Sequence, residues 1–253
     1  MKKSILVCVA IGLALTFGSI AMAGTGAPGT GIGNTSHDLS LSATFGDSAE
    51  RGAGGLNRIC IYCHAPHNTV KPSGTNTYMP LWNHAASLNQ PIDFTMYRNT
   101  ITGDIPDNIA HRSQAMELMT VPGSVSLLCL SCHDGSVATN EYGMNSGLSS
   151  KGLKDQFIPA GGRASIGFGA DLSNHHPIGF DYQSVIDGGD DEINATITDV
   201  GATGLTIADL LTKGRMECST CHDVHNTKNT GEKFLWISDA GSALCLTCHK
   251  KNG

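Results

Sequence analysis

Four copies of one short cysteine pattern constrain this chain more than any other feature of its sequence. Each copy reads Cys-x-x-Cys-His. Two thiols at this spacing can add across the two vinyl groups of one haem, and the adjoining imidazole then reaches the iron from one face. The sequence therefore predicts four covalently attached haem c groups. The attachment cysteines are Cys60, Cys63, Cys129, Cys132, Cys218, Cys221, Cys245 and Cys248, and the proximal iron ligands are His64, His133, His222 and His249.

Zinc sites and redox dithiols are the alternatives for a Cys-x-x-Cys pair, but neither requires His directly after the second Cys. With 11 His in 253 residues, chance places His there about 4% of the time, and in all four pairs about four times in a million. The gaps between successive pairs are 65, 85 and 23 residues, and only the last is near zinc-ribbon spacing. Covalent haem is therefore our interpretation of all four pairs.

The N-terminus predicts export. Residues 1–23 have the pattern of a signal peptide: Lys2 and Lys3, an apolar run over 4–20, and Ala21-Met22-Ala23 as a small-residue cleavage site. A membrane anchor is the alternative, but this ending and the Gly-rich sequence after it favour cleavage. We expect an extracellular or cell-surface protein, with the periplasm as the alternative, and no membrane insertion after cleavage.

Composition bounds the partners and the fold class. The chain without residues 1–23 has 253 − 23 = 230 residues, 14 basic and 22 acidic, for a net charge of −8. Nucleic acid is therefore not expected as a partner. Aromatic residues make up only 6% and there are 31 Gly, so apolar side chains are too sparse to fill an ordinary core. We expect mostly irregular chain with short helices and few short strands around four stacked haems that form the core.

An internal repeat organises the chain as two doubled haem units. Cys-x-x-Cys-His-x-x-His-Asn occurs at 60–68 and again at 218–226, and each copy is followed by Leu-Trp and then by Leu-Cys-Leu-x-Cys-His. We expect one tetrahaem unit over 24–253. It comprises a flexible Gly-rich arm (24–45), a first doubled unit (55–135), an irregular insertion (136–212) and a compact second doubled unit (213–253).

Seven further histidines can supply the sixth iron ligands. His67 and His225 each lie three residues after a proximal His, so the two rings share one face of a helical turn. Axial ligands approach a haem from opposite sides, so each of these two must serve a neighbouring haem. His37, beyond the flexible arm, can bind a haem of its own chain or of a neighbouring molecule. The expected distal ligands for an all-bis-His protein are His37, His67, His84, His176 and His225.

Catalysis is not expected, and no catalytic residue is assigned. A multihaem reductase needs an iron with an open site and often has an altered motif, whereas all four motifs here keep the proximal His. The spare histidines also outnumber the four remaining axial positions. One-electron cycling of iron is the chemistry that fits.

These blocks resemble the doubled Cys-x-x-Cys-His family of multihaem c-type cytochromes. Further matching blocks cover nearly the whole chain after the signal segment: Ser36-His37-Asp38, Pro80 to His84, Leu128 to Gly135 and His176-Pro177-Ile178. Four haems, this length and a signal peptide are most similar to the OmcE-type extracellular tetrahaem cytochromes. That resemblance implies electron transfer along a head-to-tail filament of identical copies, toward other redox proteins and external acceptors such as metal oxides. A monomeric periplasmic shuttle is the alternative, and a multihaem reductase a more distant one.

Overall fold

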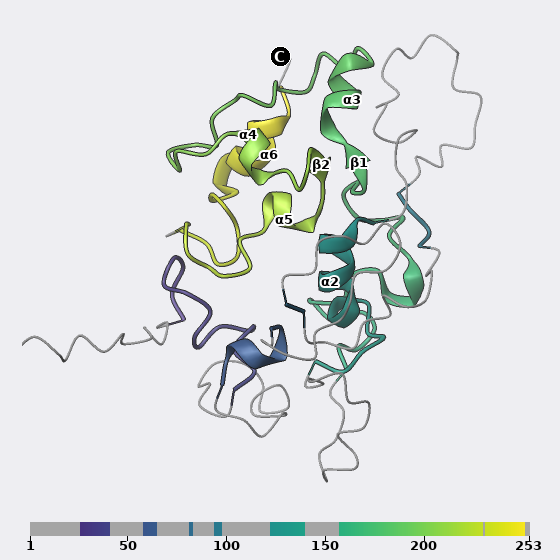
Figure 1. Cartoon of the computed structure of the whole chain (residues 1–253), viewed down its shortest axis with the longest axis vertical. Helices are drawn as coiled ribbons and strands as arrows, with labels where there is room; N and C mark the ends of the chain where they lie inside the picture. Colours follow the sequence, from purple (N-terminus) through teal and green to yellow (C-terminus); the bar gives the residue numbers. More distant parts are fainter. Residues whose placement is uncertain are drawn as a thin grey trace, which may run out of the picture.

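The structure is a computed structural model of the 253-residue chain, and it describes residues 26–40, 58–64, 81–82, 94–97, 122–139, 157–229 and 231–250. The predicted signal segment and three histidines, His67, His84 and His111, lie outside these residues. Within these described residues, short helices alternate with irregular stretches (Figure 1). In the described part of the chain, no helix has the length and apolar character needed to cross a membrane.

Each haem motif lies on a helical turn. These turns are η1 (Cys60–Tyr62), α2 (Ser124–His133), α5 (Cys218–Cys221) and α6 (Ala243–Cys248). The other described elements are η4 (Phe168–Ala170), β1 (Phe180–Asp181), α3 (Tyr182–Asp187), α4 (Ile207–Leu210), β2 (Arg215–Met216) and η5 (Ala240–Ser242). This is the predicted fold class, mostly irregular chain with short helices and few strands.

The strand pair β1–β2 fastens the insertion to the second doubled unit. The strands run antiparallel, with Phe180 opposite Met216 and Asp181 opposite Arg215. Asp181 also begins α3, because its carboxylate accepts a hydrogen bond from the Ser184 N–H at 2.8 Å. Around the strands lies a small apolar cluster of buried side chains: Phe180, Tyr182, Val185, Ile207 and Met216.

A second apolar cluster holds α2. Leu130 of α2 packs with Phe94 and Leu172. The chain around Thr95 runs parallel to the turn at Asp171, where the Thr95 N–H donates to the Ala170 carbonyl and the Leu172 N–H donates to the Thr95 carbonyl, both at 2.8 Å. Helix α2 ends where Gly135 takes a positive φ of 75°, a conformation that favours glycine.

The predicted flexible arm is docked over residues 26–40. The buried side chain of Asn226, in the third haem motif segment, donates to the carbonyls of Ala27 at 2.8 Å and Gly31 at 2.9 Å. The Gly31 N–H donates in return to the Asn226 carbonyl at 2.8 Å. Composition predicted flexibility because these residues lack apolar periodicity, but their backbone groups find partners on a distant loop.

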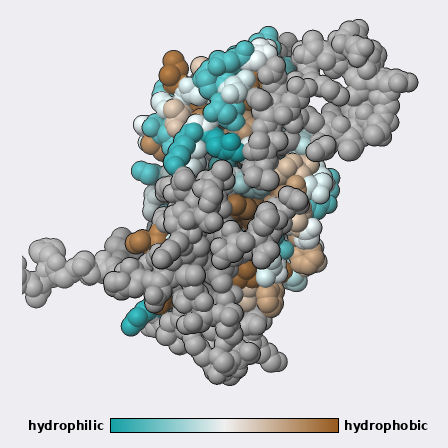
Figure 2. All heavy atoms as spheres, turned by 45° about the vertical axis from the view of Figure 1, so that its right-hand side comes forward, coloured by the Kyte–Doolittle hydropathy of each residue, from teal (hydrophilic) through white to brown (hydrophobic). Residues whose placement is uncertain are grey.

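Helix α5 contacts both α2 and α4, and in Figure 1 it lies below α4 and α6 and above α2. Figure 2 shows that hydrophilic side chains gather over the upper part of the described surface, with smaller hydrophobic patches below. The third motif is therefore the meeting point of the two halves of the chain.

Candidate functional site

A helical turn fixes each proximal imidazole relative to its cysteine pair. In three motifs the N–H of the proximal His donates to the carbonyl of the first Cys: His64 at 2.8 Å, His222 at 3.1 Å and His249 at 2.9 Å. In the second motif, helix α2 continues through His133. Thiols and imidazole thus sit on one turn in all four motifs, the arrangement that haem attachment needs.

Thiols of neighbouring motifs come near one another in the second, third and fourth motifs. Burial raises the pKa of Cys63 and of Cys221 to about 11, and Cys248 and Cys245 lie close enough to Cys221 to contribute. A hydrogen bond between the Cys129 and Cys218 thiols raises the pKa of Cys129 and lowers that of Cys218. The first cysteines of the second and third motifs are therefore neighbours.

Three proximal histidines each face a second histidine. The ring centres are 6.3 Å apart for His64 and His225. They are 6.1 Å apart for His133 and His37, and 6.2 Å for His249 and His176. Each pair joins residues distant in sequence, so tertiary packing creates it.

These separations fit haem iron. An imidazole nitrogen binds a transition metal at about 2 Å, and the ring centre lies roughly 1 Å further out, so two imidazoles on opposite faces of one iron have centres roughly 6 Å apart. The rings also differ in orientation. The planes of His64 and His225 meet at 23°, whereas those of His37 and His133 meet at 79° and those of His176 and His249 at 68°.

Backbone carbonyls orient several of these rings. Nδ1 lies 2.7 Å from the Ala164 carbonyl oxygen in His133, 3.0 Å from that of Phe234 in His222, and 2.8 Å from that of Pro177 in His176. A carbonyl partner makes Nδ1 the protonated donor and leaves Nε2 to bind metal, as is usual for histidine ligands. The donor set therefore suits iron.

His37 is held in the neutral form. Burial, followed by the nearby His133 ring, lowers the pKa of His37 to about 4. Its ring also packs against Phe234, with centres 4.5 Å apart. Of the two expected roles for His37, ligation within its own chain or in a neighbouring molecule, this placement favours the first.

His175 is engaged differently from its neighbour His176. The Gly167 N–H donates to His175 Nε2 at 3.3 Å, so that nitrogen serves a backbone contact. Sequence reasoning favoured His176 over His175, and only His176 faces a proximal His among the described pairs. The expected ligands His67 and His84 lie outside the described residues, and their roles stay predictions.

Sequence reasoning missed two buried polar residues. Asn226 docks the N-terminal arm by donating a hydrogen bond to the Gly31 carbonyl. Glu217 joins the third motif to the second by accepting a hydrogen bond from the Ser126 hydroxyl of α2. Asn226 had a usable signal, because His-x-x-His-Asn recurs in both repeats. Glu217 had none, since a single acid before a cysteine motif has the pattern of a surface residue.

Comparison with known proteins supports the haem interpretation in the C-terminal part. Residues 211–253 match a family model described as the doubled CXXCH motif. No curated protein matches the chain. The match covers α5 and α6 with both of their Cys-x-x-Cys-His motifs. It indicates covalently bound haem c and supports a multihaem c-type cytochrome in electron transfer.

Proposed function

We propose that this protein is an electron-transfer cytochrome with four haems, each held between two histidines. The observation that carries the proposal is the trio of histidine pairs with ring centres 6.1 to 6.3 Å apart. Each pair joins the proximal His of one motif to a His from another part of the chain. Such pairs suit a haem iron, which takes one axial ligand from each face.

The pairs support a ligand scheme for three irons. In this scheme the first iron would be held by His64 and His225, the second by His133 and His37, and the fourth by His249 and His176. For the third iron, with His222, we propose His67, because the repeat makes it the counterpart of His225. The two repeats then exchange ligands, with His84 as the alternative for the third iron.

Bound haem would supply one-electron cycling between ferric and ferrous iron. The chain's part is to hold the axial ligands still, so that little rearrangement accompanies a change of charge. Thioether bonds from both cysteines and a carbonyl-fixed Nδ1 on the ligand serve that purpose. Two protein ligands also fill both axial positions, so a substrate has no open site. An enzyme is therefore not proposed.

The cellular setting is proposed from the sequence. The signal segment supports export, and the resemblance to extracellular tetrahaem cytochromes supports polymerisation into a filament that delivers electrons to external acceptors. His37 opposite His133 gives no support to a metal bond across subunit junctions, so polymerisation would rest on other contacts. Electron microscopy of the native extracellular fraction tests it, and a monomer confined to the periplasm would contradict it.

Electron paramagnetic resonance of the oxidised holoprotein tests the ligand scheme. Near-parallel imidazoles split the iron d orbitals and give a rhombic low-spin signal, whereas near-perpendicular ones leave them almost degenerate and give a strongly anisotropic signal. We expect both types, the first from the His64–His225 iron and the second from the irons of His133 and His249. A high-spin haem in the resting protein would instead favour the reductase alternative.

A further inference from the structure

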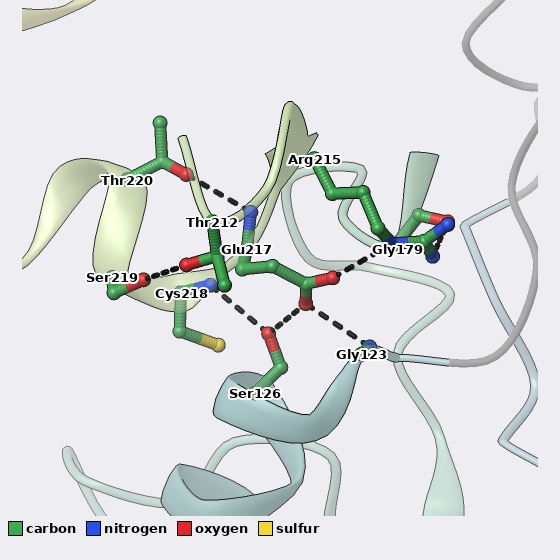
Figure 3. A network of polar contacts seen from close by, with 9 residues as sticks. All are labelled: Gly123, Ser126, Gly179, Thr212, Arg215, Glu217, Cys218, Ser219 and Thr220. Carbon is green, nitrogen blue, oxygen red and sulfur yellow. Dashed lines mark hydrogen bonds and ion pairs between the residues drawn. The ribbon is translucent and has the colours of Figure 1, made fainter. Parts of the chain in front are cut away.

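One buried carboxylate lies where the second and third haem motifs meet. Glu217 directly precedes Cys218 and is only 2% exposed. Figure 3 shows its side chain pointing from the start of α5 toward the first turn of α2. A carboxylate is costly to bury unless charge and hydrogen bonds compensate it, so its surroundings need an explanation.

Three donors surround the carboxylate, two of them on the other motif. Oε2 accepts from the Gly123 N–H at 3.1 Å and from the Ser126 hydroxyl, both at the start of α2. Oε1 accepts a hydrogen bond from Arg215 Nε at 3.2 Å. The same contact is an ion pair between the guanidinium and the carboxylate. Arg215 in turn donates to the Gly179 carbonyl beside β1. One side chain thus ties α2 to the segment that leads into α5.

Ser126 extends the tie to the cysteine itself. Its hydroxyl oxygen accepts from the Cys218 N–H at 3.0 Å while its proton goes to Glu217. The backbone of Cys218 is therefore held to the same helix that carries Cys129. This holds together the two segments whose thiols, Cys129 and Cys218, hydrogen-bond with each other.

Gly123 shows how close the fit is. Its φ of −72° and ψ of 172° suit any residue, so conformation does not demand glycine here. A Cβ added at Gly123 would instead overlap the Glu217 carboxylate. The backbone of α2 approaches the acid so closely that a side chain at this position would displace it.

We propose that Glu217 is a positioning residue that sets the approach of the second and third haems. Each of Cys129 and Cys218 forms a thioether to its haem in the proposed function, on which this inference rests. The Glu217 and Ser126 contacts hold the backbone of Cys218 against α2, which carries Cys129, so haems attached to these two cysteines would lie near each other. The junction between the two doubled units is then an electron crossing whose geometry the Glu217 contacts fix.

The test uses variants on both sides of the contact in the holoprotein. Glu217→Ala removes the acceptor, and Gly123→Ala displaces it without altering Glu217. Glu217→Gln keeps an acceptor oxygen of the same reach for Gly123 and Ser126 and serves as the conservative rescue. Glu232→Ala is the matched control, because that carboxylate accepts instead from the Asp239 N–H on an exposed loop.

The readout is magnetic coupling between ferric haems in the paramagnetic resonance spectrum, with haem count and spin state measured alongside. We expect both alanine variants to keep four low-spin haems but to lose coupling between the second and third. Glu217→Gln should retain most of it, and Glu232→Ala all of it. Should Glu217→Ala fail to fold, Gly123→Ala and Ser126→Ala carry the same comparison.

Two outcomes overturn the inference. Unchanged coupling in both Glu217→Ala and Gly123→Ala would show that the haem approach does not depend on this contact. Equal loss of coupling at every haem would show general destabilisation instead of positioning. Fewer than four haems in the unaltered protein is a different result, because it would overturn the proposed function itself.

Discussion

The first and third haem motifs share a nine-residue pattern but differ in how they join the rest of the chain. In both, a tryptophan folds back onto the motif. Trp82 packs edge-on against His64, with ring centres 6.2 Å apart. Trp236 donates through its ring N–H to the Ser219 carbonyl at 2.8 Å. The repeated tryptophan thus meets its own motif in both copies, through a different contact in each.

The difference lies in the residue before the first cysteine. It is Ile59 in the first motif and Glu217 in the third, and Leu in the other two motifs. Ile59 is half-buried, whereas Glu217 is buried and tied to α2. The repeated residues therefore form each haem motif. Glu217, which lies outside the repeated pattern, joins the third motif to the second.

The largest expected effect comes from deleting the third attachment site. The third motif contacts α2 of the second, has Cys221 near Cys248 of the fourth, and faces His64 of the first through His225. We expect Cys218→Ala with Cys221→Ala to give a protein with one haem fewer and a clearly lower thermal unfolding midpoint. Mass spectrometry and a thermal melt measure both.

The matched variant deletes the first attachment site, Cys60→Ala with Cys63→Ala. It also removes one haem, but Cys60 is exposed, so we expect the smaller drop in unfolding midpoint. A larger drop for the first site than for the third would contradict the central place given to the third motif.

The next effect is spectroscopic and tests ligand exchange between repeats. His225→Ala should turn one of four haems high-spin, and the affected iron should be that of His64, because those two rings face each other at 6.3 Å and 23°. The rhombic signal of near-parallel imidazoles should disappear while the strongly anisotropic signals remain.

A His176→Ala variant is the control for that experiment, since its ring meets His249 at 68°. It should remove a strongly anisotropic signal and leave the rhombic one. If His225→Ala leaves all four haems low-spin, His225 is not an axial ligand.

A moderate effect is expected from Asn226, which docks the N-terminal arm. Asn226→Ala removes its hydrogen bonds to the Ala27 and Gly31 carbonyls, each worth about 0.5–1.5 kcal/mol, so we expect a loss of about 1–3 kcal/mol in the free energy of unfolding. Denaturant unfolding measures it. Asn174→Ala, at an exposed position, should change stability by no more than about 0.5 kcal/mol, and an equal loss there would contradict the docking role.

Sequence can predict the attachment sites because their chemistry is local, and the family match supports the two motifs within residues 211–253. Two thiols and an imidazole must lie on one turn, so a five-residue pattern suffices, as at Cys218 to His222. Sequence also predicts that His225 serves another haem, since ring geometry forbids its own. It does not predict which haem, because that depends on how His64 and His225, 225 − 64 = 161 residues apart, pack together.

The contacts that the sequence does not predict have one cause in common. Glu217 and Asn226 act through backbone groups of distant segments, Gly123 in one case and Ala27 in the other. A backbone N–H or carbonyl is present at almost every position, so composition and periodicity carry no trace of such a partner. The docked arm was predicted to be flexible for the same reason.

The smallest expected effect comes from giving the first motif the third motif's acid. Ile59→Glu places a carboxylate at a half-buried position, where it can turn toward water and avoid most of the cost of burying a charge. The isoleucine loses only part of its apolar burial, so we expect a change within about 1 kcal/mol in the free energy of unfolding and an unchanged count of four haems. Denaturant unfolding and mass spectrometry measure these.

A severe loss of stability or of the first haem would show that the first motif also depends on the residue before its cysteine, and the contrast with Glu217 would then fail. The small effect is expected because the acid matters only where donors from a second motif meet it, as Gly123 and Ser126 meet Glu217.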